Sequence, residues 1–499
     1  MDRLLSVTSS IWVIHVNLCQ PSFEQKQHGL GGGIPALKAI WDWLDLSLLF
    51  SQSGIRKHAG VPAWTLSFAY VCGLMARATS TNKIAEYVSG SPLFRCLLPT
   101  SMTQCSLSRF LSTSYDWLSF SLGRLSRLQE KPECRLEDGD VVALDDTKLE
   151  HPYGKLIPFL CWLFDYSDKR HVWCMNIVST LAVRQNGLEY PLLWRFWTKS
   201  HQDSDAPSKI DLAKQMLKDI RSLTSARLFV TMDRWFLCKR FLVWLTAQGF
   251  DWVTKAKRNT VLFRRMYDPA LGKEVYTKVN PSLLLREIYP MLRLRKKGQS
   301  MGLPAIYMKL PYEMTTRKGK SITRQRYVPI AAVAATMSHS TSADVLMPMV
   351  KEEAVATYQD AYLLLSNRVD TPDIAAEVYG RRWRIEVFYR AAKQDLGLTA
   401  CTARSKMAHF AHVELVFTAM TLLSIALWRE KKEGVVQAPT LSEMARCFFN
   451  ASYRICCCNQ QIHVYFDTVT ERFASLIESF WPTSFDCKLW DWNSLPESA

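Results

Sequence analysis

Four residues in the last third of the chain have types and a spacing that could act on a phosphate ester: Tyr379, Arg382, Glu386 and Lys393. If the segment YGRRWRIEVFYRAAK, residues 379–393, forms one helix, the four side chains lie within an arc of about 60°, because each residue turns the helix by about 100°. Arginine offers phosphate a bidentate fork and lysine a point charge, while a carboxylate can hold a metal ion. A solvated helix face with ion pairs between neighbouring turns would show the same pattern. The positions of carboxylates elsewhere in the sequence must therefore distinguish a phosphate-binding, metal-binding helix face from a solvated one.

Two aspartates follow short apolar runs that are typical of buried strands. Asp145 comes directly after VVAL, residues 141–144, and Asp233 directly after LFVTM, residues 228–232. An aspartate at the carboxyl end of a buried strand lies at the rim where α/β sheets place their functional sites. Each alone is more typical of a turn or a helix cap, but together with Glu386 they predict a pocket of carboxylate oxygens. Such a pocket suits two Mg²⁺ or Mn²⁺ ions, which could activate the attacking oxygen and stabilise the leaving one in a phosphoryl displacement.

The elements that must position these residues follow from the apolar patterns. Residues 136–260 predict strand, strand, strand, helix, strand, helix, strand in that order. Asn186-Gly187 is a strong signal for a hairpin turn between the second and third strands. The segment PSKIDLAKQMLKDIRSL, residues 207–223, is amphipathic at helical spacing and begins with a proline. We therefore expect an α/β core.

The rest of the chain divides around this core. Proline breaks, alternating apolar runs and basic clusters predict a β-rich insertion, and helical spacing predicts an all-helical N-terminal region and a C-terminal helical region. The segment TQCSLSRFLSTSYDWL, residues 103–118, fits either a helix that enters DNA or one packed in a helical bundle. The predicted divisions are a flexible N-terminus at 1–34, a helical DNA-binding region at 35–135, the first part of the core at 136–260, the insertion at 261–355, the second part of the core at 356–432 and a C-terminal region at 433–499.

The composition indicates a polyanionic partner. Lys and Arg exceed Asp and Glu, 62 against 46, which gives a net charge of +16. This favours nucleic acid or an anionic membrane surface, although a generally basic protein would show the same excess. The longest uncharged apolar stretch near the C-terminus, LVFTAMTLLSIALW at 415–428, is shorter than the roughly 20 residues that span a bilayer and predicts a buried core helix rather than a membrane segment. The 14 cysteines lack the paired spacing of a zinc site, which favours reduced thiols.

Taken together, the motifs resemble those of the DDE transposases of bacterial insertion sequences. The four residues of the helix match the Y-(2)-R-(3)-E-(6)-K signature of the hairpin-forming subgroup at every position. The segments LDDT, with Asp145, and MDRWF, with Asp233, are similar to the two aspartate motifs of the family. The resemblance covers about residues 135 to 430. It indicates Asp145 as the first metal ligand, with Asp146 as the alternative, because a slip of one residue in strand register would exchange the two.

The resemblance implies an RNase H-like core and a metal-dependent DNA transposase. The enzyme would nick the ends of the element, form and reopen a hairpin, and join the freed 3′-hydroxyl to target DNA. The residues that it assigns to catalysis and to two Mg²⁺ or Mn²⁺ ions are Asp145, Asp233 and Glu386. Those that it assigns to phosphate contacts near the cut are Tyr379, Arg382 and Lys393.

Further expectations concern the partners. The basic segment with Arg317, Lys318 and Lys320 would follow the DNA backbone, although a solvated charged loop would look the same. The resemblance implies double-stranded DNA, namely terminal inverted repeats and target, a dimer in the synaptic complex, and a place with the nucleoid in a bacterial cytoplasm. Two other functions remain open, a two-metal nuclease without strand transfer and a catalytically inactive DNA-binding protein derived from a transposase.

Overall fold

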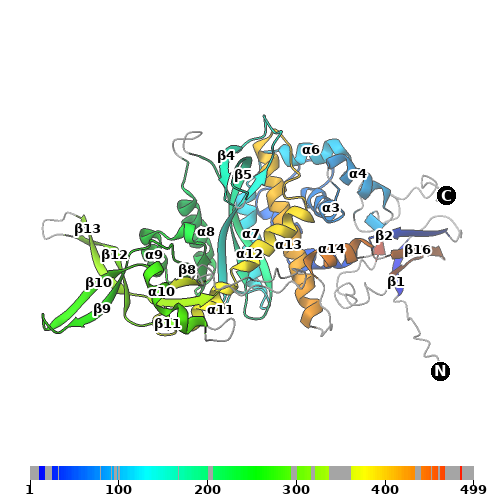
Figure 1. The fold of residues 1–499 in the computed structure, drawn as a ribbon. Helices are drawn as coiled ribbons and strands as arrows, with labels where there is room; N and C mark the ends of the chain where they lie inside the picture. The colour runs from blue at the N-terminus through cyan, green and yellow to red at the C-terminus, as the bar shows by residue number, and fades with distance from the viewer. Residues whose placement is uncertain are drawn as a thin grey trace, which may run out of the picture.

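The chain forms an elongated molecule, with strands from both ends of the sequence at one extremity and long hairpins at the other (Figure 1). The structure is a computed structural model. It describes residues 11–16, 25–31, 33–78, 80–91, 93–94, 98, 102–166, 168–199, 206–293, 300–315, 321–336, 361–432, 440–450, 452–458, 461–466 and 484–485.

A nine-stranded mixed sheet forms the centre of the molecule. Its strands in spatial order are β11 (Met301–Leu303), β14 (Ala331–Thr336), β15 (Ala361–Ser366), β8 (Asp251–Lys255), β7 (Phe229–Met232), β3 (Val141–Glu150), β5 (Arg170–Val183) and β4 (Cys161–Asp165), with β6 (Glu189–Trp197) also paired to β5. β3 runs antiparallel to β5 and parallel to β7, and β7 runs parallel to β8. The two strands that carry the aspartate motifs are therefore direct neighbours. β4 was not predicted, because its residues lie in a run in which apolar and polar residues do not clearly alternate.

Local sequence signals account for the predicted hairpin and for the helix that follows. Gly187 has a φ of +84°, which suits glycine, and the turn at Asn186-Gly187 joins β5 to β6 as predicted. The amphipathic segment forms α8 (Lys209–Leu223), and the side chain of Ser208 caps it by accepting a hydrogen bond from the backbone N–H of Asp211. The next predicted helix is α9 (Lys239–Ala247).

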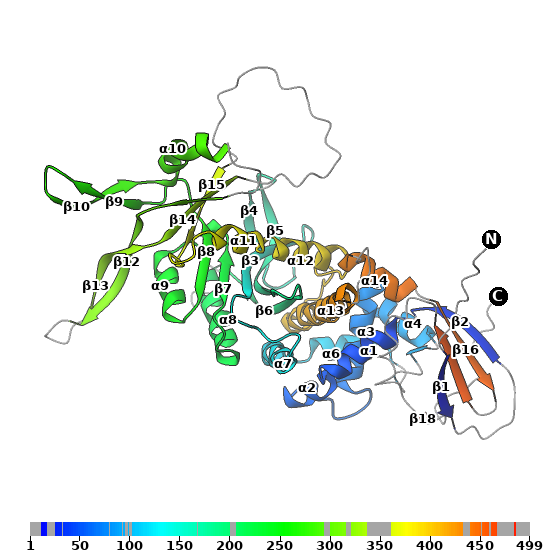
Figure 2. The same cartoon turned by 90° about the horizontal axis from the view of Figure 1, so that it is seen from below.

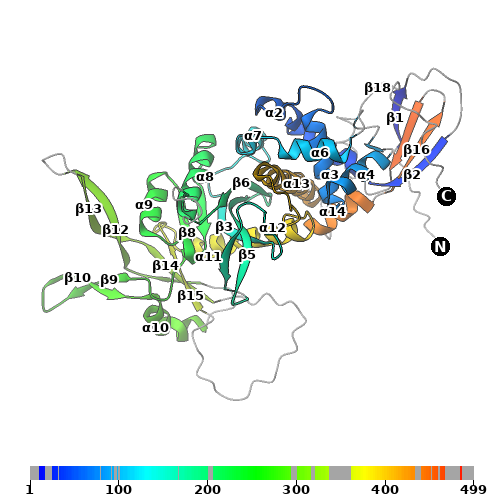
Figure 3. The ribbon, with the colours of Figure 1, turned by 90° about the horizontal axis from the view of Figure 1, so that it is seen from above.

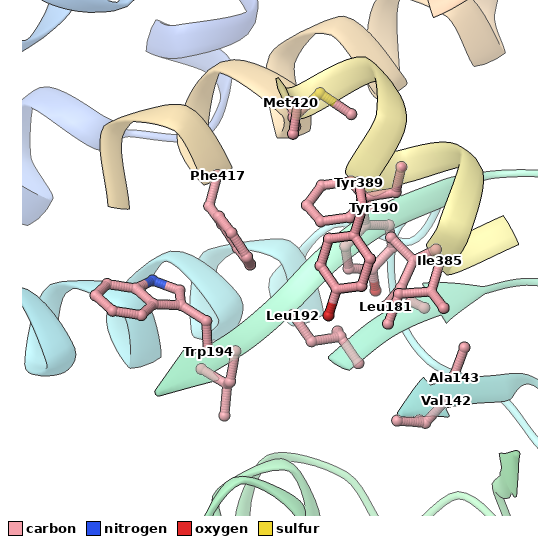
Figure 4. Packing of buried hydrophobic residues seen from close by; sticks show 14 of the residues in the cluster. Val142, Ala143, Leu181, Tyr190, Leu192, Trp194, Ile385, Tyr389, Phe417 and Met420 are labelled. Atoms are coloured by element: carbon pink, nitrogen blue, oxygen red, sulfur yellow. The ribbon is translucent and has the colours of Figure 1, made fainter. Parts of the chain in front are cut away.

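Helices cover both faces of the sheet. α8 packs against β5 and β6, whereas α12 (Trp383–Gln394) packs against β3 and β5 on the other face. Figure 4 shows Ile385 and Tyr389 of α12 in one apolar cluster with Leu181 of β5 and with Phe417 of α13 (Lys406–Lys432). The helix that carries Glu386 is thus fixed to the sheet by burial of its apolar side.

The N-terminal helical region packs against α13. Its described helices are α1 (Ile34–Trp43), α2 (Leu46–Gln52), α3 (Ala63–Met75), α4 (Thr81–Gly90), α6 (Gln104–Ser112) and α7 (Trp117–Glu130). Glu414 of α13 accepts hydrogen bonds from Arg124 Nε of α7 at 2.8 Å and from Trp194 Nε1 of β6 at 2.7 Å, and the side chains of Arg124 and Glu414 are fully buried. A buried ion pair is tolerated only with such complete hydrogen bonding. This contact joins the helical region, α13 and the sheet.

The predicted core helix at 415–428 is confirmed, but it is part of a longer element. The segment Lys406–Arg429 of α13 is long and apolar enough to cross a membrane by composition alone, yet 94% of its most apolar window is buried inside the protein. The core of the molecule supplies the apolar surroundings that this helix requires.

Both ends of the chain differ from the predictions. Residues 1–34 were expected to be flexible, yet they contain β1 (Ile11–Val16) and β2 (Gln25–Leu30). The C-terminal region was expected to be helical, yet α14 (Leu441–Asn450) is followed by β16 (Ser452–Cys458), β17 (Gln461–Phe466) and β18 (Ser484–Phe485). These strands form one five-stranded sheet in the order β18-β1-β17-β16-β2. β1 and β2 are paired only with strands from the C-terminal end, so they have no local partner among the described residues, whereas β16 and β17 also pair with each other as a hairpin that was not predicted.

The insertion is only partly a separate β-structure. A four-stranded sheet in the order β10-β9-β12-β13 contains β9 (Leu262–Asp268), β10 (Lys273–Val279), β12 (Ile306–Thr315) and β13 (Ser321–Pro329), while α10 (Pro281–Arg293) was not predicted. β11 and β14 instead join the central sheet. Figures 2 and 3 show the β9–β10 and β12–β13 hairpins projecting away from the helical region.

Candidate active site

The parallel pairing of β3 and β7 brings the two predicted aspartates to the same point of the sheet. Leu144 is the register partner of Met232, so the next residues, Asp145 and Asp233, follow side by side. β7 ends there, but β3 does not, because β5 continues to pair with it as far as Glu150. The prediction that Asp145 lies beyond a strand end is therefore wrong, although Asp233 does follow the end of β7.

Asp145 and Asp146 point to opposite faces of the sheet, as neighbours on a strand do. Asp145 Oδ2 accepts a hydrogen bond from Arg382 Nη1 at 2.9 Å, on the side of α12. Asp146 Oδ2 accepts from Lys209 Nζ at 2.7 Å and from Asn176 Nδ2 at 2.8 Å, on the side of α8. Asp145 is thus the one of the two that faces Glu386 and its helix.

The predicted single helix at 379–393 is interrupted. α11 (Ile374–Gly380) ends just before Arg381, and α12 begins at Trp383. Across the break the backbone N–H of Arg382 bonds to the carbonyl of Tyr379 at 3.0 Å, an i to i+3 contact that makes a tighter turn than an α-helix does. Tyr379 therefore lies on α11, while Glu386 and Lys393 lie on α12.

Arg382 bridges the carboxylates of two predicted metal ligands. Besides its bond to Asp145, it donates from Nη2 to Glu386 Oε1 at 2.6 Å. Its guanidinium carbon lies 5.6 Å from the centre of the Tyr379 ring. Only 13% of the Arg382 side chain is exposed, and its Nε is buried without a hydrogen-bond partner among the described residues. Arg382 therefore lies at the centre of the cluster formed by Asp145, Glu386 and Tyr379, and not at its edge.

Burial changes the acid–base properties of the cluster. It raises the pKa of Asp145 to about 7, against the opposing effect of Arg382, and the charges of Asp146 and Asp233 add to the rise. Burial also raises the pKa of Tyr379 to about 12. The Tyr379 hydroxyl therefore keeps its proton at neutral pH and can donate a hydrogen bond to an anion.

Lys393 lies at the other end of α12 and does not contact the acids. Burial lowers its pKa, and the nearby charges that act on it belong to Glu150, Lys148 and Asp165. The predicted phosphate-binding residues Arg317, Lys318 and Lys320 lie outside the described residues, between β12 and β13.

Two residues that the sequence patterns did not single out also belong to the site. Tyr389 of α12 donates a hydrogen bond to the backbone carbonyl of Asp145 at 3.0 Å and lies 2.8 Å from Ser179 Oγ, so it fixes α12 to β3 and β5. Lys255, at the end of β8, has a pKa lowered by burial and by Arg234, while Asp233 acts to raise it. The sequence could have indicated Tyr389 by its position one turn after Glu386. It could have indicated Lys255 by its position at the end of a predicted strand.

The chemistry of the donors fits a divalent metal, but their arrangement is not that of a preformed site. Among the residues that the structure describes, no three Asp, Glu, His or Cys side chains are grouped so that they could hold a metal ion. The guanidinium of Arg382 lies between Asp145 and Glu386 and forms an ion pair with each. Carboxylate oxygens are the ligands that Mg²⁺ and Mn²⁺ prefer. In this structure Arg382 therefore occupies carboxylate oxygens of two of the three acids that were predicted to hold metal.

The raised pKa of Asp145 predicts a pH dependence of stability with a defined sign. The ordinary pKa of this carboxyl group is 3.8. Between this pH and about pH 7, Asp145 keeps a proton in the folded protein that it has released in the unfolded chain. Stability therefore falls as the pH rises through this window, by at most about 1.4 kcal/mol per pH unit. Urea unfolding at about pH 5 and about pH 8 should show that Asp145→Asn gains stability relative to the wild type between these values. An identical pH response of both proteins would contradict the shift.

Comparison with known proteins identifies the class of enzyme. Residues 204–422 match the family described as transposase DDE domain. A cryo-EM structure of a piggyBac transposase synaptic complex with hairpin DNA is similar with a TM-score of 0.40 and 10% identity, over 91% of this chain and 84% of that chain. No curated protein matches the sequence. The similarity of residues 204–422 to the transposase DDE domain confirms the expectation of a DNA transposase enzyme at the level of the enzyme class.

The matched segment contains all but one of the predicted catalytic acids. Asp233 and Glu386 lie within residues 204–422, as do Tyr379, Arg382 and Lys393, whereas Asp145 precedes them. The link between Asp145 and this segment is the pairing of β3 with β7 and the contact with Arg382.

Proposed function

We propose that this transposase cuts DNA at the ends of a bacterial insertion sequence and joins the freed ends to target DNA in a metal-dependent reaction. The observation that carries the proposal is the contact of Arg382 with both Asp145 and Glu386, beside the point where β3 and β7 bring Asp145 next to Asp233. The match to the transposase DDE domain supports the same reaction class.

We further propose that the core is RNase H-like. The strand order β6-β5-β3-β7-β8, with antiparallel pairing among the first three strands and parallel pairing from β3 to β8, supports this. The resemblance implies an aspartate on the first of three antiparallel strands and a glutamate on a helix after a β-strand insertion. Asp145 of β3 and Glu386 of α12 agree with those positions.

The metal ligands in this proposal are Asp145, Asp233 and Glu386, which would hold two Mg²⁺ or Mn²⁺ ions. The ions would supply electrophilic stabilisation of the scissile phosphate and of the oxygens that attack and leave. The residues of the chain itself prepare that state. Arg382 is the cation bound to Asp145 and Glu386, and a phosphate group competes with carboxylates for a guanidinium fork. We infer that the DNA backbone draws Arg382 away from Asp145 and Glu386.

The phosphate contacts would come from Tyr379, Arg382 and Lys393, with the basic segment at Arg317, Lys318 and Lys320 along the DNA outside the site. The hydroxyl of Tyr379, protonated at neutral pH because its pKa is raised by burial, is suited to donate to a phosphate oxygen. Lys393, two turns after Glu386 on α12, would hold a phosphate farther along the strand.

Membership of the hairpin-forming subgroup also belongs to the proposal. It rests on the exact spacing of Tyr379, Arg382, Glu386 and Lys393. The partners would be the terminal inverted repeats and target DNA, bound by a dimer. The protein would be associated with the nucleoid in a bacterial cytoplasm. The excess of basic residues supports a DNA partner.

A strand-transfer assay separates this function from its two alternatives. Purified protein is mixed with Mn²⁺, a supercoiled plasmid and labelled end fragments taken from the DNA that borders the open reading frame. Transfer of label to the plasmid is expected, and fragments that end in a 3′-deoxynucleotide serve as the control because they cannot attack. Cleaved ends without transfer would identify a nuclease, and retarded but uncut DNA would identify an inactive DNA-binding protein.

A further inference from the structure

One face of the ribbon formed by β4 and the first part of β5 is covered by aromatic rings. Trp162 and Phe164 of β4 are the register partners of Trp173 and His171 of β5, so these four side chains share a face. The ring centres lie 5.4 Å apart for Trp162 and Trp173 and 5.2 Å apart for Phe164 and His171. Tyr166 extends the row, 5.0 Å from Phe164. We call these five residues the aromatic face.

The aromatic face is open to solvent. The exposed fractions are 56% for Trp162, 38% for Phe164 and 82% for Tyr166. The loop before β4 adds the exposed Tyr153, and Trp173 Nε1 donates a hydrogen bond to the Gly154 carbonyl at 2.7 Å, which holds this loop beside the ribbon. β4 is the last strand on its side of the central sheet. Large exposed apolar surfaces mark interaction sites in many soluble proteins.

The charges around the aromatic face favour an anionic partner. Arg170 pairs with both Glu150 and Asp168, and because it alternates with His171 along β5, its side chain lies on the other face of the ribbon. Lys155 and Lys169 are exposed, and no ion pair involves either of them among the described residues. Flat aromatic rings bordered by unneutralised cations are the combination that binds the bases and backbone of single-stranded nucleic acid. The net charge of +16 points the same way.

The spacing of the rings favours an unpaired strand over a duplex. Alternate residues of a strand, such as Trp162 and Phe164, are about 6.8 Å apart. That is twice the rise of about 3.4 Å per nucleotide in duplex DNA. Successive bases could therefore stack on successive rings only if the DNA strand were stretched and unpaired.

The aromatic face lies on the same side of the sheet as Asp145. Ser179 of β5 is the register partner of Asp145, and Trp173 and His171 are an even number of residues before Ser179 on the same strand. At the far end of α12, the charges that act on Lys393 include Lys148 and Asp165, at the margin of the ribbon. A DNA strand that leaves the acids along α12 would reach Lys393 and then the ribbon.

We propose that the aromatic face binds unpaired DNA bases next to the cleavage site, in an interaction that does not depend on base sequence. The inference rests on the proposed function for its biological setting, but the binding itself requires neither metal nor cleavage. A second copy of the chain is the main competing occupant of an exposed aromatic surface.

The test measures binding of the full chain to dye-labelled oligo(dT) and to a duplex of equal length by fluorescence anisotropy, in EDTA. The double variant Trp162→Leu/Tyr166→Leu removes two rings but keeps apolar side chains on the strand, so a protein contact would largely persist. We expect oligo(dT) affinity to fall by at least about 30-fold, because two base–aromatic stacks are lost, and duplex affinity to change much less. Tyr267→Ala, which removes an exposed tyrosine from the β9–β10 hairpin, is the matched control and should bind like the wild type.

The outcomes separate this inference from the proposed function. Unchanged oligo(dT) affinity of the double variant overturns the inference even if the strand-transfer assay succeeds. A loss of oligo(dT) affinity supports the inference even if the strand-transfer assay fails. Unchanged oligo(dT) binding, together with concentration-dependent self-association of both wild type and variant in sedimentation, assigns the surface to a protein contact and also overturns the inference. If the double variant unfolds at a lower temperature, the single variant Tyr166→Leu, at a residue 82% exposed, decides instead, with a loss of oligo(dT) affinity of at least about fivefold expected for one stack.

Discussion

Asparagine in place of Asp145 is expected to lower the rate of DNA end cleavage by at least about 100-fold, whereas asparagine in place of Asp146 should leave it nearly unchanged. The two carboxylates are neighbours on β3 and receive the same chemical change, but only Asp145 faces Arg382 and Glu386. Asp146 is bound by Lys209 and Asn176 on the other face of the sheet. Cleavage of labelled end fragments in Mg²⁺, under single-turnover conditions, gives both rates.

The pair of variants contains its own control for folding. Asp146→Asn removes an ion pair with Lys209 and should lose some stability, so thermal unfolding of both variants shows whether a slow enzyme is simply less folded. The opposite ranking, with Asp146→Asn inactive and Asp145→Asn active, would assign the metal to Asp146 and would contradict the proposed site.

Replacing Arg382 by alanine is expected to have opposite effects on metal binding and on catalysis. Without DNA, the variant should bind Mn²⁺ at least tenfold more tightly (about 1.4 kcal/mol), because Asp145 and Glu386 lose the cation that neutralises them. Cleavage should nevertheless fall at least about 100-fold, because the proposed phosphate contact is lost. Electron paramagnetic resonance of free Mn²⁺ measures the first effect, and the end-cleavage assay measures the second.

Arg381→Ala is the matched control for this prediction. Arg381 is the preceding residue and has the same charge, but it pairs with Glu377 on the outer side of α11. Its removal should change Mn²⁺ affinity little. If Arg382→Ala binds Mn²⁺ no more tightly than the wild type does, Arg382 does not compete with the metal, and the proposed displacement of Arg382 by DNA is wrong.

Several elements of the core were predictable because their signals are local. The apolar run before Asp233 forms β7, the amphipathic segment at 207–223 forms α8, and Asn186-Gly187 forms a hairpin turn. Each depends on residues within a few positions of one another, either through side-chain periodicity or through the turn preferences of asparagine and glycine. The N-terminal strands β1 and β2 have no such signal, since they pair with β17 and β16, more than 400 positions away.

The sequence by itself determined which residues could form the site. Three acids, an arginine, a tyrosine and a lysine at defined spacing, together with a strongly basic composition, indicated phosphoryl transfer on DNA, because these properties depend on residue type and order alone. Tertiary structure decided how the residues meet. The pairing of β3 with β7 and β5 selected Asp145 over Asp146, the tight turn before Trp383 separated Tyr379 from Glu386, and packing of α12 on the sheet set Arg382 between two carboxylates. Contacts between residues more than 200 positions apart depend on strand register and helix packing, which no local pattern specifies.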